Sequence, residues 1–196
     1  MRFSCQQSGN CCCDQNIIVT LTYRDIFLLY MILDTSFEKL LQNISFYTLK
    51  ESLINILKKQ MVLEPIQTSQ GNVIPGLRKH EGGSCVFYSH PNCSIYSNRP
   101  LACRNYPFAF ISEGDRIKPV WAKKSLHSCP GIGKGLPISS DTIKRLGEKV
   151  QEEIQLQNQV VRNLNIEALE GRPLTAREAL WILVIYGEKE YEQEGK

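Results

Sequence analysis

The sequence of 196 residues has no long apolar run and little net charge. Its longest apolar stretches, 26–33 and 181–186, fall far short of the roughly 20 residues that a membrane-spanning helix needs. The first residues also lack the apolar core of a secretory signal peptide. Lysine and arginine number 23 against 20 acidic residues, and this net charge of +3 does not indicate nucleic acid binding. We therefore expect a cytoplasmic protein that does not associate with membranes.

Recognisable motifs of nucleotide-binding and hydrolytic enzymes are also missing. The segment 131–135 (GIGKG) lacks the spacing of a phosphate-binding loop, and the Leu-Pro after it does not open a helix. We expect a tight turn there. No G-x-G-x-x-G motif stands in a strand–helix context, which argues against a Rossmann fold. Because no carboxylate pair or Ser/His/Asp arrangement is recognisable either, the sequence leaves open whether the chain is an enzyme.

Cysteine is the residue that stands out, since the chain has eight of them in groups. In a reducing cytoplasm disulfides are rare, and grouped cysteines are more often metal ligands or redox centres. Disulfides and inert buried thiols are the alternatives. No pair has the C-x-x-C spacing, so the common zinc-finger and ferredoxin patterns do not apply. The cysteines are Cys5, Cys11, Cys12, Cys13, Cys85, Cys93, Cys103 and Cys129.

Thiolates are soft ligands suited to zinc, copper(I) and iron–sulfur clusters. Four of them on zinc or on a [4Fe–4S] core leave a net charge of about −2, which requires nearby cations and amide donors. Basic residues beside the cysteines are either such cations or solvated surface charges, and glycines let amides approach sulfur. Loop histidines are further candidate ligands, although they are more often exposed. These residues are Arg99, Arg104, Lys123 and Lys124; Gly9, Gly82 and Gly83; and His80, His90 and His127.

The adjacent cysteines pose a geometric problem. On an extended strand, the side chains of Cys11 and Cys12 point to opposite faces. Either the backbone turns there and both reach one centre, or they serve two centres, or one of them packs in the core. The cysteines form two blocks, residues 5–12 and 85–103. No spacing ties Cys13 to the second block, so we expect it to be a core or spare thiol. We expect residues 1–16 as a whole to form a loop.

Capping residues and apolar periodicity predict an α+β fold, mainly helical, with a small irregular β-hairpin region that holds the cysteine cluster. We expect the last ten residues, which are rich in charge, to fray. The predicted helices are 23–33 (cap Thr22, with Asp25 in the first turn), 37–42 (cap Ser36), 46–59, 140–164 (cap Ser140 or Asp141) and 176–186 (cap Thr175, with Glu178 completing a capping box). The predicted hairpins pair 61–68 with 73–77 and 108–112 with 116–121.

Two segments resemble one known family. They are FSCQQSGNCC at 3–12 and CVFYSHPNCSIYSNRPLACRNYPF at 85–108, and CPGIGKG at 129–135 is also similar. The resemblance covers about residues 3–137 and identifies the chain as a member of the CxxCxxCC family of zinc- or iron-chelating domains, which includes the YkgJ-like proteins. Ser8 stands where the family name has a second cysteine, so the first block has one ligand fewer. The matching positions in the second segment are Cys93, Ile95, Tyr96, Arg99, Pro100, Cys103, Arg104 and Pro107.

The resemblance implies that a zinc ion or an iron–sulfur cluster, [4Fe–4S] above all, is bound through clustered thiolates. It implies a cysteine-cluster metal-binding domain at 1–137, with a C-terminal helical extension at 138–196 packing on it. Some relatives are flagellin lysine N-methylases, so a cluster-dependent methyltransferase is one alternative function. The other is a metal-folded interaction module whose C-terminal helices bind a protein partner. The implied ligands are Cys5, Cys11, Cys12, Cys85, Cys93 and Cys103, with Cys129 as a seventh candidate.

Overall fold

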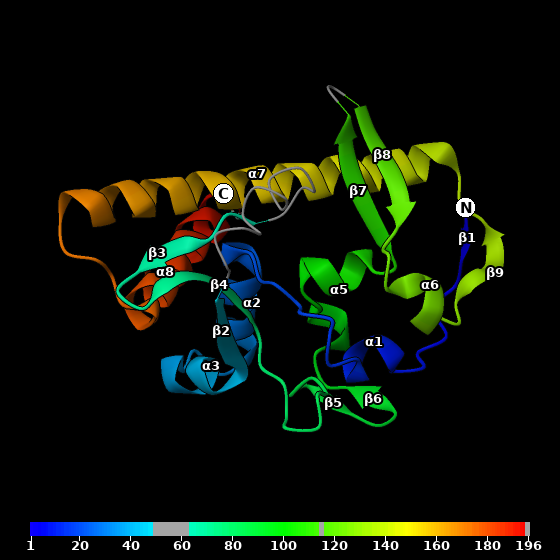
Figure 1. Cartoon of the computed structure of the whole chain (residues 1–196), viewed down its shortest axis with the longest axis horizontal. Helices are drawn as coiled ribbons and strands as arrows, with labels where there is room; N and C mark the ends of the chain where they lie inside the picture. The colour runs from blue at the N-terminus through cyan, green and yellow to red at the C-terminus, as the bar shows by residue number, and fades with distance from the viewer. Residues whose placement is uncertain (49–62, 114–115, 195–196) are drawn as a thin grey trace.

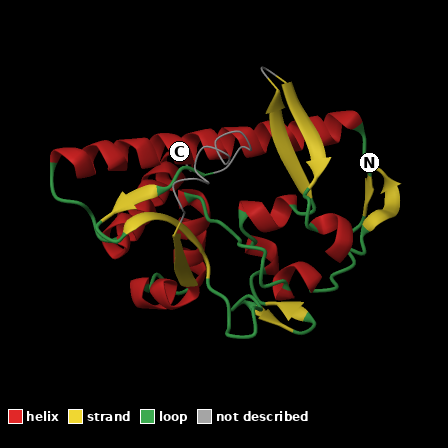
Figure 2. Ribbon diagram, viewed as in Figure 1, coloured by secondary structure: helices red, strands yellow, loops and turns green. Residues whose placement is uncertain are grey.

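The computed structural model describes residues 1–48, 63–113 and 116–194. They form an α+β fold, as predicted, with small separate sheets (Figures 1 and 2). None of the described helices is long and apolar enough to cross a membrane. The helices are α1 (Asn10–Cys13), α2 (Tyr23–Ile32), α3 (Phe37–Asn43), α5 (Leu101–Asn105), α6 (Ser125–Ser128), α7 (Ser140–Glu170) and α8 (Ala176–Glu194). The strands are β1 (Arg2–Phe3), β2 (Ile44–Thr48), β3 (Ile66–Thr68), β4 (Gly71–Leu77), β5 (Tyr88–Ser89), β6 (Asn92–Cys93), β7 (Phe108–Glu113), β8 (Arg116–Trp121) and β9 (Ile132–Pro137).

The strands pair in antiparallel fashion, and the largest sheet has the order β2–β4–β3. Both predicted hairpins are confirmed as β3–β4 and β7–β8, although β3 begins only at Ile66. The pair β5–β6 forms a third, very short hairpin. Strand β1 pairs with β9, so the start of the chain lies against the segment 132–137. The tight turn expected at 131–135 lies in this segment: the amide of Lys134 donates to the carbonyl oxygen of Gly131, and Gly133 and Gly135 have positive φ. The residues on either side of it, Ile132 and Pro137, pair with β1.

The predicted helix 46–59 is wrong at its start. Residues 46–48 belong to β2, and residues 49–62 lie outside the described part of the chain. Tyr47 lies opposite Ile74 of β4, and its hydroxyl donates a 2.8 Å hydrogen bond to the carbonyl oxygen of Leu77. This pairing with a distant strand overrides the local apolar periodicity, which alone favours a helix.

Most of the predicted helix caps are confirmed. Thr22 forms a capping box with Asp25, Ser36 accepts from the amide of Lys39, and Thr175 and Glu178 exchange hydrogen bonds. Helix α7 differs, because its cap is Ser139 and not Ser140 or Asp141. Both C-terminal helices are also longer than predicted. The expected fraying is wrong for residues 187–194, since Arg24 and Tyr23 of α2 hold Glu190 of α8.

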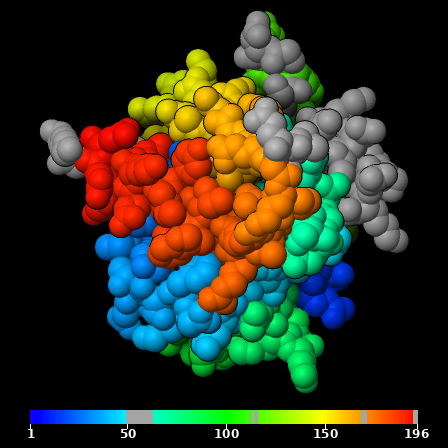
Figure 3. All heavy atoms as spheres, turned by 90° about the vertical axis from the view of Figure 1, so that its left-hand side faces the viewer, coloured from blue at the N-terminus to red at the C-terminus, as the bar shows by residue number. Residues whose placement is uncertain are grey.

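Helix α8 packs against α2 and α7 to form the main core. On the surface in Figure 3, the C-terminal part of the chain (orange to red) lies against its N-terminal part (blue). Leu180 and Leu183 of α8, Ile26 of α2 and Leu164 of α7 belong to one buried cluster and are at most 1% exposed. The C-terminal helices therefore share their core with earlier parts of the chain. The division at residue 137 stays a prediction.

The other half of α7 supports the region of the cysteines. Ile143 and Val150 of α7 form a second buried cluster with Phe108 and Phe110 of β7 and with Leu101, the first residue of α5. Below α7 in Figure 1, α1, α5, α6 and the β5–β6 hairpin gather in one region. Helix α7 thus packs against both clusters, and the main core itself includes Cys85, with Cys12 and Cys93 packed against it.

Candidate metal centre

The first cysteine block forms a short helix and not the expected loop. Gly9 precedes α1 with φ +73°, and its carbonyl oxygen accepts hydrogen bonds from the amides of Cys12 and Cys13. In a helix, neighbouring side chains are about 100° apart rather than on opposite faces. The backbone therefore turns at this point, and the sulfur atoms of Cys11 and Cys12 lie 4.0 Å apart.

The three cysteines of the second block, and Cys129 beyond it, lie on or beside several different elements. Cys85 precedes the β5–β6 hairpin, Cys93 is in β6, Cys103 is in α5 and Cys129 follows α6. The amide of Cys85 donates a 2.8 Å hydrogen bond to the carbonyl oxygen of Cys12. The two blocks are thus joined through the backbone.

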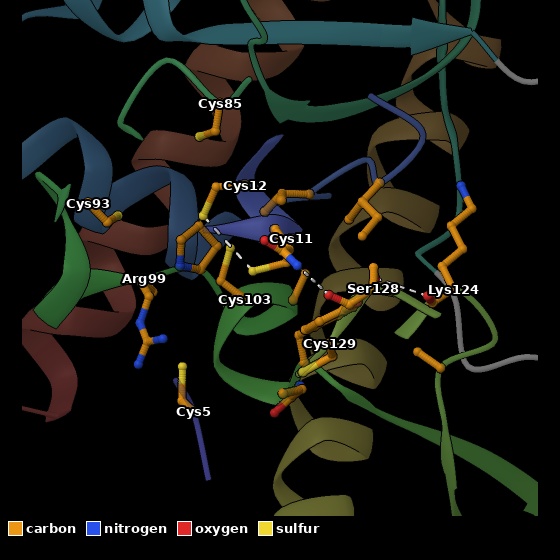
Figure 4. Close-up of a pocket in the computed structure, with 18 of the residues that line it drawn as sticks. Cys5, Cys11, Cys12, Cys85, Cys93, Arg99, Cys103, Lys124, Ser128 and Cys129 are labelled. Carbon is orange, nitrogen blue, oxygen red and sulfur yellow. Dashed lines mark hydrogen bonds between the residues drawn. The ribbon is translucent and has the colours of Figure 1, made fainter. Parts of the chain in front are cut away.

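Helix α6 is also tied to the first block. The side-chain amide of Asn10 donates a 2.9 Å hydrogen bond to the carbonyl oxygen of Ser128, the residue before Cys129 (Figure 4). On the opposite side of the same loop, the amide of Ser4 donates to the carbonyl oxygen of Gly131. A Cβ at Gly131 would lie 2.4 Å from the carbonyl oxygen of Ser4, so only glycine permits this approach. These contacts place Cys5 and Cys129 at the edge of the site.

Seven of the eight cysteines line a single cavity of about 610 Å³ (Figure 4). Cys13 is exposed and does not line it. His80, His90 and His127 are absent from the described lining. The cysteines in the wall are Cys5, Cys11, Cys12, Cys85, Cys93, Cys103 and Cys129.

The cysteines that line the cavity interact electrostatically with one another. Burial raises the pKa of Cys103, and the charges of Cys85, Cys11 and Cys93 raise it further. Burial likewise raises the pKa of Cys85, with Cys93 and Cys11 adding to the effect. Like charges in one cavity oppose joint deprotonation, so these thiols become thiolates together only when a cation compensates them.

Cys11 and Cys12 form a hydrogen-bonded pair within this group. A hydrogen bond from the Cys12 thiol lowers the pKa of Cys11 to about 7, and backbone amides of α1 and the charge of Arg99 act in the same direction. The same hydrogen bond and burial raise the pKa of Cys12. One thiolate in the pair is therefore favoured, while the second is disfavoured without added positive charge.

The positions of the thiols do not by themselves make a coordination shell. Within the described residues, no three Cys, His, Asp or Glu side chains are arranged to hold one ion. The 4.0 Å between the sulfurs of Cys11 and Cys12 is close to the ~3.8 Å edge of a tetrahedron with zinc–sulfur distances of about 2.3 Å. The donor set thus suits zinc or iron, provided that further thiols move inward.

Three of the four predicted compensating cations line the cavity: Arg99, Lys123 and Lys124. The guanidinium of Arg99 lies 3.8 Å above the ring of Tyr96 and donates to the carbonyl oxygen of Tyr96. Lys124 donates to the carbonyl oxygen of Asn16, in the loop after α1. The fourth cation, Arg104, is outside the lining.

Arg104 instead contacts the buried side chain of Asp25. The sequence indicated Asp25 only as a residue in the first turn of a helix. Asp25 is 2% exposed and accepts hydrogen bonds from the amides of Thr22 and Leu101, so it ties α2 to the start of α5. Arg104 lies 3.8 Å from Asp25 and 3.7 Å from Glu153. Burial, and then the charge of Glu153, raises the pKa of Asp25 to about 7.

Two further residues of the cavity wall carry buried polar atoms without a hydrogen-bond partner, the hydroxyl of Tyr88 and Oδ1 of Asn105. The sequence indicated Tyr88 only as one of several aromatic residues in the second block, and nothing in it indicated Asn105. Of the predicted glycines, Gly9 lies directly against Tyr88. The amides of Cys11 and Cys12 act on the sulfur of Cys11, and the amide of Phe87 acts on that of Cys85.

An α+β chain that gathers seven thiols from two blocks into one cavity is a cysteine-cluster protein. The chain belongs to the CxxCxxCC family, described as "Putative zinc- or iron-chelating domain", whose model matches residues 4–130. The match confirms the family predicted from the sequence. No curated protein and no solved structure shows a significant match.

Proposed function

We propose that this chain binds zinc or iron through thiolates drawn from both cysteine blocks. The observation that supports this best is the selective gathering of cysteines: seven line one cavity, while Cys13, next to Cys12 in sequence, does not. Burial of cysteine for packing alone gives no reason for thiols from α1, β6, α5 and three connecting segments to share one cavity.

The thiolates of Cys11, Cys12, Cys85 and Cys103 are the proposed ligands. The charges of the other three cysteines raise the pKa of Cys12, and the charges of Cys85 and Cys11 raise the pKa of Cys103. Figure 4 shows the side chains of Cys11, Cys12 and Cys103 pointing toward one another at the centre of the view. Four thiolates complete the tetrahedral shell that zinc prefers in structural sites. Cys93, whose charge also raises the pKa of Cys85 and of Cys103, is a further candidate ligand, and Cys5 and Cys129 lie in the wall around this shell.

A second candidate is an iron–sulfur cluster, [4Fe–4S] above all. The size of the cavity, about 610 Å³, and the number of thiols favour it, since a single ion leaves three thiols unused. In either case a reducing compartment such as the cytoplasm keeps the eight unpaired cysteines available for binding.

Metal and sulfide analysis of anaerobically purified protein tests the proposal and separates its two forms. Stoichiometric zinc or iron without sulfide supports the single ion, and iron with equal sulfide and visible absorption supports the cluster. Cys103→Ser should lose most of the metal, while Cys13→Ser should keep it. Wild-type protein that holds no metal after reconstitution, or equal metal content in both variants, would contradict the proposal.

The two alternative functions, a cluster-dependent methyltransferase and a metal-folded interaction module, stay predictions. The described residues offer no observation that favours a methyltransferase or an interaction module over a metal-binding protein. A test for the first is binding of S-adenosylmethionine by the metal-loaded chain. A test for the second is a partner whose binding is lost when exposed residues of α8 are changed.

A further inference from the structure

The hydroxyl of Tyr88 is buried in the wall of the cysteine cavity and has no hydrogen-bond partner. Buried polar groups are normally paired, and an unpaired one points to an absent water, ion or ligand. The described residues therefore offer no hydrogen-bond partner to the Tyr88 hydroxyl.

The chain makes room for this side chain at one point in particular. A Cβ on Gly9 would lie 1.9 Å from the hydroxyl oxygen of Tyr88 and 2.3 Å from its Cζ. Gly9 also has φ +73°, which any other residue adopts with strain. The tip of Tyr88 is thus held against the residue that starts α1.

The second block fixes Tyr88 from the other side. Its amide donates a 2.9 Å hydrogen bond to the carbonyl oxygen of Cys85, and it lies opposite Cys93 in the β5–β6 hairpin. Burial, and then the charges of Cys13, Cys12 and Cys11, raise the pKa of Tyr88. The hydroxyl is therefore placed between the two blocks and beside α1.

A neutral thiol is a weak hydrogen-bond acceptor, whereas a thiolate is an anion that accepts strongly. Metal binding converts the thiols of the site into thiolates. The unpaired donor of Tyr88 would then have an acceptor within the same cavity. A donor placed in this way stabilises the thiolate form and the metal complex, as second-shell groups do in other metal sites.

We propose that the Tyr88 hydroxyl is the hydrogen-bond donor to a metal-bound thiolate of α1, that of Cys11 or Cys12. Tyr88 is a positioning residue that stabilises the loaded state at the expense of the empty one. This inference rests on the proposed metal binding, and it adds a residue that is not itself a ligand.

The test compares Tyr88→Phe with Tyr106→Phe, using Zn²⁺ and a competing chromogenic chelator at fixed pH. Tyr106 also lines the cavity, but its hydroxyl is already bonded to the Ser128 hydroxyl at 2.9 Å, so it is a matched control. Tyr88→Phe keeps the ring that packs on Gly9 and removes only the hydroxyl. We expect it to weaken zinc binding by about 10- to 100-fold, with Tyr106→Phe close to wild type.

Thermal unfolding of the metal-free proteins separates this role from a structural one. Removing a buried hydroxyl that has no partner should leave the melting temperature of metal-free Tyr88→Phe equal to or above that of wild type. Weaker zinc binding together with undiminished metal-free stability supports the inference. If Tyr88→Phe binds zinc with wild-type affinity, or loses affinity and metal-free stability together, the role of Tyr88 is contradicted while the proposed metal binding still stands. Wild-type protein that binds no zinc or iron would overturn the proposed function and this inference with it.

Discussion

The backbone amide of Cys85 donates a 2.8 Å hydrogen bond to the carbonyl oxygen of Cys12, and this bond joins the two cysteine blocks. It involves no side chain, so the polypeptide itself brings α1 against the turn before β5. The backbone therefore brings the thiols to one cavity, and within the described residues no three metal-ligating side chains converge on a single ion. Thiols held near one another by the backbone lose less conformational freedom when they bind a metal.

Metal binding should tighten this junction. We expect amide hydrogen exchange at 9–14 and 85–103 to slow on metal loading, while α8, which packs in the main core, changes little. Hydrogen-exchange mass spectrometry of metal-free and loaded protein measures the difference. Uniform slowing along the chain, or none at the cysteine blocks, would contradict a site at this junction.

Gly9→Ala should damage both the fold and the site. The new Cβ would collide with the Tyr88 hydroxyl, and φ +73° adds strain of about 1–3 kcal/mol. We expect a lower free energy of unfolding in urea and a lower metal content. Gly71→Ala is the control, because Gly71 also has a positive φ but no atom within 4 Å of the added Cβ. Gly71→Ala should lose some stability and keep its metal; equal metal loss in both variants would refute the role of Gly9.

The pKa of Asp25 predicts a pH dependence of stability. Its folded-state pKa of about 7 lies above its ordinary value of 3.8, because burial and Glu153 disfavour the charged form. The folded protein therefore binds more protons than the unfolded chain between these two values. The contribution of Asp25 to stability is fully present below about pH 4 and is lost as the pH rises through 7, by about 4 kcal/mol at most.

Asp25→Asn removes this titration. Urea unfolding of the metal-free proteins at pH 5 and pH 8 should show a larger loss of stability with rising pH in wild type than in Asp25→Asn. The variant should be less stable than wild type at pH 5, because Asn cannot accept from both the Thr22 and the Leu101 amides with the same geometry. An identical pH dependence in the two proteins would show that Asp25 does not titrate in this range.

The thiol pair predicts a reactive cysteine in the metal-free protein. The Cys12 hydrogen bond lowers the pKa of Cys11 to about 7, so much of Cys11 is thiolate at neutral pH. Peptide mapping after brief alkylation should find Cys11 modified early, and Cys12→Ala should slow that reaction. Metal loading should abolish it in wild type. An unchanged rate at Cys11 in Cys12→Ala would contradict the pairing.

Local signals in the sequence were enough to predict several elements correctly. The caps at Thr22, Ser36 and Thr175 each depend on residues within one turn, and the β7–β8 hairpin pairs two strands that are close in sequence. The segment 46–48 could not be predicted in this way. Its strand depends on pairing with β4, which lies far along the chain.

Which cysteines bind the metal stays a prediction. Spacing and family resemblance separated six cysteines of the two blocks, with Cys129 as a seventh candidate, from Cys13, and these seven line the cavity. The turn of α1 depends on the left-handed backbone of Gly9, and the support from Asp25 depends on contact with α5. The first relation is local, but the sequence does not show the positive φ of Gly9. The second joins residues 76 positions apart, which their order in the sequence does not reveal.

X-ray absorption at the metal edge of the loaded protein tests thiolate binding most directly. We predict about four sulfur neighbours at about 2.3 Å from zinc, or sulfur neighbours with short iron–iron distances if a cluster is bound. The Cys103→Ser variant should lose this sulfur shell, and Cys13→Ser should keep it. A first shell made of oxygen and nitrogen alone in the wild-type protein would contradict metal binding by these cysteines.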